Sequence, residues 1–139
     1  MSRRFLLAAA ALLLPAALQA QATATPIDSL ALGRQYTQWF YTGMADSLIA
    51  HMPAEDRAQM TTEQILNQLD MLTARAGNEL EVIEEKFIKR NGHTQYWRTA
   101  KFDNMSEPLL LRWVILPGGE IGGIGMGPLS QAPPIDPAN

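Results

Sequence analysis

The chain has 139 residues, with 11 Lys and Arg against 14 Asp and Glu, 47% hydrophobic residues and no cysteine. This length gives room for one domain, and the mixture of hydrophobic and charged residues is typical of a folded globular chain. The lack of cysteine excludes a disulfide scaffold, a thiolate nucleophile and a cysteine-ligated zinc site.

The first 22 residues have the layout of a secretory signal peptide. Arg3 and Arg4 provide a positive start, an apolar run covers residues 5–18, and Ala20-Gln21-Ala22 supplies the small residues of a cleavage site. The apolar run contains a proline and is shorter than the ~20 residues that span a bilayer. We therefore predict cleavage after Ala22, with Ala20 as the alternative. The mature protein is expected to be secreted or periplasmic in a bacterium, without a membrane span.

The mature chain is acidic. Removal of Arg3 and Arg4 leaves nine basic residues against 14 acidic ones. Phosphate backbones and anionic lipid surfaces both attract basic proteins. The charge balance therefore argues against nucleic acid and against a membrane surface as partners.

Helical patterns come first in the mature chain. Thr25 and Pro26 form a helix start, with Thr25 as the cap, and a shorter helical piece ends before Pro53. Thr61 and Gln64 have the spacing of a capping box. The two main helices carry apolar stripes at helical spacing, namely Leu32, Tyr36, Trp39, Phe40 and Gly43 in the first, and Ile65, Leu69, Leu72 and Ala76 in the second.

After residue 78 the apolar period changes towards 2, which predicts strands over residues 80–90, 95–102, 109–116 and 121–126. Asn91-Gly92 is a strong signal for a two-residue hairpin turn, and residues 129–139 read as a Pro-rich flexible tail. Helices followed by an antiparallel meander predict an α+β fold. The expected domain covers residues 23–128, with N-terminal helices packed on a curved four-stranded sheet.

Turn lengths predict the strand register. A two-residue Asn91-Gly92 loop pairs Arg90 with His93 and places Glu85 opposite Arg98. If the loop over residues 103–107 closes symmetrically, Arg98 faces Arg112. The expected result is a row of three charges, Glu85–Arg98–Arg112, on one face of the sheet.

Both faces of the predicted sheet are apolar. In an antiparallel sheet with one face in water, apolar and polar residues alternate along each strand, and these strands lack that alternation. We therefore expect the helices to cover one face and a second subunit or another envelope protein to cover part of the other. A homodimer is the simplest such assembly. The acidic cluster over residues 79–86 reads as a solvated strand edge that discourages further pairing.

Five segments of the chain carry a resemblance, namely residues 34–43, 45–48, 82–86, 98–102 and 116–123. They resemble the cone-shaped nuclear-transport-factor-2-like modules. More narrowly, they are similar to an uncharacterised family of exported bacterial domains that often stand N-terminal to serine hydrolase domains. The likeness covers residues 27–128 and implies a curved sheet around a pocket, without implying an activity. The chain has no Gly-x-Ser-x-Gly elbow, so hydrolase activity is not carried over.

Ligand-binding candidates come from the aromatic residues and the charged row. Aromatic rings line many small-molecule pockets, and paired arginines hold carboxylates or phosphates. The alternatives are core packing for the rings and internal pairing for the charges. Glu85, with Tyr36 or Tyr96 as proton donor, is the one candidate acid–base group, but an opposed arginine would depress its pKa. The candidates are Tyr36, Trp39, Glu85, Tyr96, Arg98 and Arg112.

No cofactor, metal site or catalytic residue is predicted. His51 and His93 lack carboxylates at ligand spacing. The glycines over residues 123–127 precede Pro128 rather than a helix, so they do not make a phosphate-binding loop. The sequence therefore predicts an exported, non-catalytic binding or assembly module. The alternative is a small pocket enzyme of isomerase or dehydratase type that uses a carboxylate base.

Overall fold

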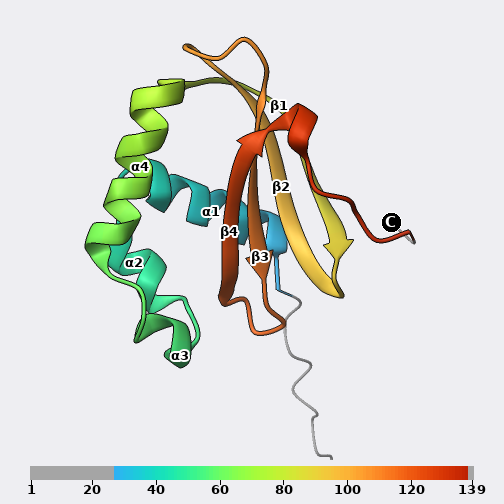
Figure 1. Ribbon diagram of the computed structural model, residues 1–139. Helices are drawn as coiled ribbons and strands as arrows, with labels where there is room; N and C mark the ends of the chain where they lie inside the picture. Colours follow the sequence, from blue (N-terminus) through green and yellow to red (C-terminus); the bar gives the residue numbers. More distant parts are fainter. Residues whose placement is uncertain (1–26, 138–139) are drawn as a thin grey trace, which may run out of the picture.

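The computed structural model describes residues 27–137, so the predicted signal peptide lies outside the described residues. The fold is α+β, with four α-helices followed by a four-stranded antiparallel sheet and a short 3-10 helix, η1 (Figure 1). The elements are α1 (Ser29–Tyr41), α2 (Ala45–Ala50), α3 (Ala54–Arg57), α4 (Thr62–Ala76), β1 (Glu79–Arg90), β2 (His93–Phe102), β3 (Leu109–Ile115), β4 (Ile121–Pro128) and η1 (Leu129–Gln131).

The two long helices begin with side-chain caps. The Ala31 N–H of α1 donates to the Asp28 carboxylate at 3.0 Å, so the helix starts at Ser29 with Asp28 as its cap. The predicted cap Thr25 and the predicted first position Pro26 lie outside the described residues. The capping box of α4 is confirmed, since Thr61 and Gln64 bond reciprocally. The helix ends at Ala76, and its C-cap Gly77 has a positive φ of 74°, which glycine adopts readily.

The strands follow one another in the order β1-β2-β3-β4. The predicted pairing of β1 with β2 is confirmed: Arg90 lies opposite His93, and Glu85 lies opposite Arg98. Asn91 and Gly92 both have positive φ, at 53° and 75°, as a tight two-residue hairpin turn requires. The turn chemistry therefore fixes this register locally.

The predicted pairing of β2 with β3 is wrong by one residue. Arg98 lies opposite Leu111, and Arg112 lies opposite Trp97. The loop between the strands is held by α4, because the Asp103 and Asn104 N–H groups donate to the carbonyls of residues 78 and 76. These bonds remove the symmetry that the prediction assumed. A one-residue shift moves every β3 side chain to the opposite face.

The main core lies between the helices and one face of the sheet. Trp113 and Tyr36 are at most 1% exposed there, and they pack beside Phe40, Leu111 and Ile115. On the other face, Ile88, Trp97 and Leu110 form a small buried cluster of their own. Both faces of the sheet are thus apolar in the structure.

The described part of the C-terminal segment lies on the outer face of the sheet. After η1 it crosses in front of the sheet, while α1 passes behind it (Figure 1). Asp136 is the anchor: its N–H donates to the Lys89 carbonyl at 3.1 Å, and its carboxylate accepts from the Asn91 and Gly92 N–H groups. The chain itself therefore occupies part of the face that we expected a partner to cover.

Among residues 27–137, no helix has the length and apolar character needed to cross a membrane.

Candidate functional site

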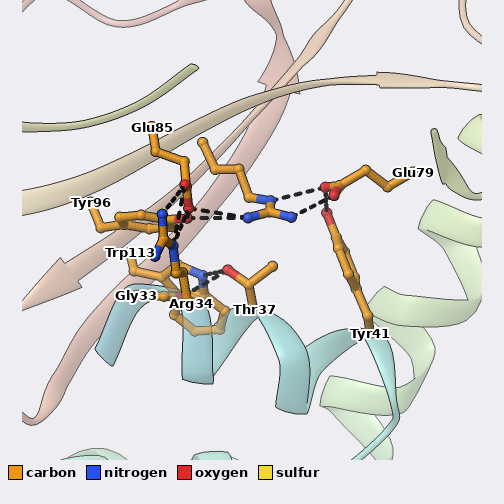
Figure 2. A network of polar contacts seen from close by, with 9 residues as sticks. Gly33, Arg34, Thr37, Tyr41, Glu79, Glu85, Tyr96 and Trp113 are labelled. Carbon is orange, nitrogen blue, oxygen red and sulfur yellow. Dashed lines mark hydrogen bonds and ion pairs between the residues drawn. The ribbon is translucent and has the colours of Figure 1, made fainter. Parts of the chain in front are cut away.

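A network of charges joins α1 to the β1–β2 hairpin (Figure 2). The Glu85 carboxylate accepts hydrogen bonds from Arg34 of α1, from Nε at 3.0 and 3.2 Å to its two oxygens and from Nη2 at 2.7 Å. It also accepts from the Tyr96 hydroxyl and from Arg98 Nη1 at 3.2 Å. Three donors from one helix and one strand therefore surround a single carboxylate.

Arg98 extends the network to a second carboxylate. Its Nη2 and Nε bond to the two oxygens of Glu79 at 2.6 and 3.0 Å. The Tyr41 hydroxyl donates to Glu79 Oε2 at 2.9 Å. The side chains of Arg98, Glu79 and Glu85 are 15–17% exposed, whereas Arg34 is 56% exposed. Two guanidiniums and two carboxylates balance in charge, so the network is internally neutralised.

The pKa values follow from these contacts. Hydrogen bonding to Arg34 lowers the pKa of Glu85 to about 2, against the opposing effect of burial. Burial and the bond to Glu85 raise the pKa of Tyr96 to about 12. Burial beside Glu79 likewise raises the pKa of Tyr41. Near neutral pH the carboxylate is charged and both phenols are protonated.

A glycine in α1 lets the network close. The Tyr96 ring lies over Gly33, where an added Cβ would stand 2.3 Å from Tyr96 Cγ. Glycine inside a helix costs about 0.5–1 kcal/mol relative to alanine. Next to it, Thr37 accepts a hydrogen bond from the Trp113 indole at 3.0 Å and donates to the Gly33 carbonyl. Close packing of α1 on β2 thus brings Arg34 of the helix within reach of Glu85.

Arg112 does not belong to this network. It alternates with Leu111 and Trp113, which face the helices, so its side chain lies on the outer face of the sheet over Gly125. Burial and the charge of Arg90 lower the pKa of Arg112. The predicted row Glu85–Arg98–Arg112 is therefore corrected: Arg98 keeps Glu85, and the other arginine on that carboxylate is Arg34.

Tyr36 and Trp39 lie in the aromatic part of the core. The ring of Tyr36 is 5.7 Å from that of Trp113, and its hydroxyl donates to the Gly119 carbonyl. The partly buried Trp39 ring lies 4.8 Å from that of His51. Tyr36 also borders a pocket of about 470 Å³ beside His51 and Gly119.

A larger pocket, here called the α4–β4 groove, lies between α4 and β4. Its volume is about 560 Å³. Arg75 is its one charged lining residue, and none of the six predicted ligand-binding residues lines it. The apolar lining comes mainly from the side chains of Phe40, Met71, Leu72, Met105, Ile124 and Met126.

Sequence reasoning missed Arg34, Tyr41, Glu79 and the groove. A signal existed for the first two, because residues seven apart share a helix face. That face turns towards the β1–β2 hairpin and meets Glu85 and Glu79 there. Within the described part of the chain, no cluster of three or more His, Asp or Glu is arranged to hold a metal ion.

Comparisons with protein-family models, with curated proteins and with solved structures give no match for this chain. The resemblance to nuclear-transport-factor-2-like modules therefore stays a prediction, and the α+β architecture is established by the structure alone.

Proposed function

We propose that this protein is an exported, non-catalytic binding module whose ligand site is the α4–β4 groove. One observation carries the proposal: an apolar pocket of about 560 Å³ lies apart from the charged network, and its lining holds no carboxylate or histidine. Ligand pockets have volumes of ~300–1,000 Å³ and apolar walls with few polar groups. The groove has these properties, with Arg75 as its cation and Gln68 as a polar neighbour.

The contacts of Glu85 argue against the alternative of a carboxylate-based isomerase or dehydratase. A general base needs a pKa near the working pH and a position beside the substrate. Glu85 has a pKa of about 2, is held by Arg34, Tyr96 and Arg98, and does not line the groove. The one charged side chain that lines the groove is that of Arg75. The groove therefore has binding chemistry without an acid–base pair.

Export is part of the proposal because the first 22 residues have the signal-peptide pattern. The resemblance to accessory domains of envelope hydrolases supports the same role, that of a module that binds a ligand or another envelope protein. Homodimerisation remains a prediction within this proposal.

The test uses Nile red, an uncharged apolar dye, with the mature protein. Met71 lines the groove and is 60% exposed, so Met71→Gln places an amide in the site with little effect on the core. We expect this variant to bind the dye about fivefold more weakly, because an unpaired amide is costly in an apolar site. Leu66→Gln is the control, since Leu66 lies on the same helix and does not line the groove.

Equal binding by both variants, or saturable binding by neither variant nor the wild type, would contradict the assignment of the groove. Native mass spectrometry of the exported protein adds an independent reading. A retained apolar ligand, released on denaturation, is the expected finding, and it should be depleted in Met71→Gln.

A further inference from the structure

Strand β4 has an open backbone edge inside the groove. Leu129 N–H donates to the Pro108 carbonyl at 2.9 Å, and Leu109 lies opposite Pro128, so residues 108 and 129 form a hydrogen-bonded pair. Such pairs alternate with non-hydrogen-bonded ones along an antiparallel ladder. Gly127 and Gly125 therefore bond towards β3, while the N–H and C=O groups of Ile124 and Met126 point to the open side.

Both ends of this edge are limited by the chain itself. At the start of β4, Ile121 N–H donates to the His51 carbonyl at 2.8 Å. At its end, Pro128 has no N–H to offer. Residues 122–127 remain between these limits, which is a length suited to pairing with a short extended segment.

The side chains around this edge define what such a segment must carry. Ile124 and Met126 line the groove with the same two residues whose backbone is open. Arg75 stands among the lining residues, in the last turn of α4, and it makes no hydrogen bond or ion pair with the residues that the structure describes. An arginine suits a helix C-terminus, and here it also leaves one uncompensated positive charge beside an apolar site.

We propose that an extended segment of another exported polypeptide adds to β4 as a fifth strand. Its backbone pairs with Ile124 and Met126, its alternate apolar side chains enter the groove, and an acidic side chain meets Arg75. This is β-augmentation, in which main-chain bonds give affinity and pockets for alternate side chains give specificity. The inference rests on the proposed function, because it names the class of ligand for that groove.

The test begins with a random heptapeptide library displayed on phage and selected on the mature protein. The selected peptides are then synthesised with blocked ends, so that a carboxylate can come only from a side chain, and their binding is measured by fluorescence anisotropy. We expect alternating apolar residues with one Asp or Glu.

Met126→Pro removes one open-edge N–H and should weaken binding by ~10-fold or more. Phe87→Pro is the matched control on β1. The tight turn makes Arg90 and His93 a hydrogen-bonded pair, so the N–H of Phe87 also points to an open edge. Proline is tolerated at such edge positions. Phe87→Pro should change the affinity by less than about twofold.

Arg75→Gln should weaken binding about threefold, the effect of one exposed ion pair, and should remove the preference for acidic peptides. Arg57→Gln is its control, since Arg57 also lies in the last turn of a helix and does not line the groove. If Met126→Pro fails to fold by circular dichroism, amide hydrogen exchange on the wild type decides instead. The bound peptide should slow exchange at Ile124 and Met126 and leave Phe87 unchanged.

Three results would overturn the inference. The first is a library that yields no binder, or yields peptides that bind Met126→Pro as well as the wild type. The second is a self-dimer that Met126→Pro dissociates. The third is protection of β1 rather than β4. Nile red binding in the groove without peptide binding would refute the strand partner and leave the proposed function standing, whereas loss of both would refute both.

Discussion

The two edges of the sheet differ in charge and in surroundings. Seven of the 12 residues of β1 are charged, and its pairing with β2 contains two register shifts. None of the eight residues of β4 is charged. Strand β1 is tied to α1 through Arg34 and Glu85, whereas β4 faces α4 across the α4–β4 groove.

This difference indicates where the protein can accept a partner. Charged side chains and bulges are features by which proteins prevent unwanted strand pairing. The β1 edge has both, although Leu80, Ile83 and Phe87 are 42–65% exposed on it. The β4 edge has no charged residue and one register shift, at Gly122 near its start, and it lies beside an apolar pocket with one cation. The sheet therefore has one edge, β1, whose charges discourage strand pairing, and another edge, β4, that is open to it.

Removal of Arg98 should have the largest effect on stability, because Arg98 forms ion pairs with both Glu79 and Glu85 of β1. Arg98→Met leaves Glu79 and Glu85, both about five-sixths buried, without their shared cation. We expect the free energy of unfolding in urea to fall by roughly 2–4 kcal/mol. Arg34→Met is the control: its side chain is 56% exposed, and its loss should lower the free energy of unfolding much less, because water screens an exposed ion pair. Equal losses would mean that the exposed Arg34 contact contributes as much as the buried Arg98 contacts, and would contradict this ranking.

Gly33 on α1 and Gly125 on β4 allow a matched comparison of how much an added methyl group destabilises each side of the molecule. An added Cβ would lie 2.3 Å from the ring of Tyr96 at Gly33, and 2.3 Å from Arg112 Nη2 at Gly125. The ring is fully buried, but the guanidinium is the end of a flexible side chain. Gly33→Ala should therefore lower the unfolding free energy by ~1–3 kcal/mol, and Gly125→Ala by less than ~1 kcal/mol. Thermal denaturation of the two variants measures the difference, and a reversed order would contradict this view of the packing.

Low pH should lower the stability of the fold, because it removes the contribution of the Glu85 carboxylate on β1. The folded pKa is about 2 and the ordinary value is 4.5, so the unfolded chain binds the proton first as the pH falls. The stability that Glu85 contributes is complete above pH 4.5 and is lost as the pH falls through about 2. Unfolding titrations in this window should show a smaller acid-induced loss for Glu85→Gln than for the wild type. Glu84→Gln, at an exposed position on the same strand, should keep the wild-type slope.

The guarding charges of β1 should affect association more than stability. Replacement of Glu81 and Glu84 by threonine removes two exposed charges. We expect little change in the free energy of unfolding but increased self-association in sedimentation velocity, because the exposed apolar residues of β1 lose the charges that discourage pairing. An unchanged sedimentation profile would show that the charges do not guard this edge.

The sequence predicts the parts of this fold that depend on local chemistry. Asn91-Gly92 determines the β1–β2 register, and Thr61 with Gln64 determines the start of α4. The β2–β3 register depends instead on bonds from Asp103 and Asn104 to the end of α4. Spacing along the chain does not reveal such tertiary bonds, and Arg112 was therefore assigned to the wrong face.

The candidate site likewise has features that local chemistry predicts and features that depend on tertiary packing. The Glu85–Arg98 pair follows from the tight turn and was predicted. The role of Arg34 depends on how α1 is rotated against the sheet, and the groove depends on the approach of α4 to a strand about 50 residues away. The apolar stripe of α4 follows from its helical spacing, yet the contribution of Leu72 to a pocket follows only from the packed structure.

The most direct test of the groove as the binding site uses the methionines. Met71, Met105 and Met126 line it, whereas Met44, Met52 and Met60 lie elsewhere in the described chain. With isotope-labelled methionine methyl groups, titration with Nile red or a selected peptide should shift the first three signals and leave the other three in place. Shifts at Met44, Met52 and Met60, with Met71, Met105 and Met126 unchanged, would place the binding site elsewhere and contradict the account.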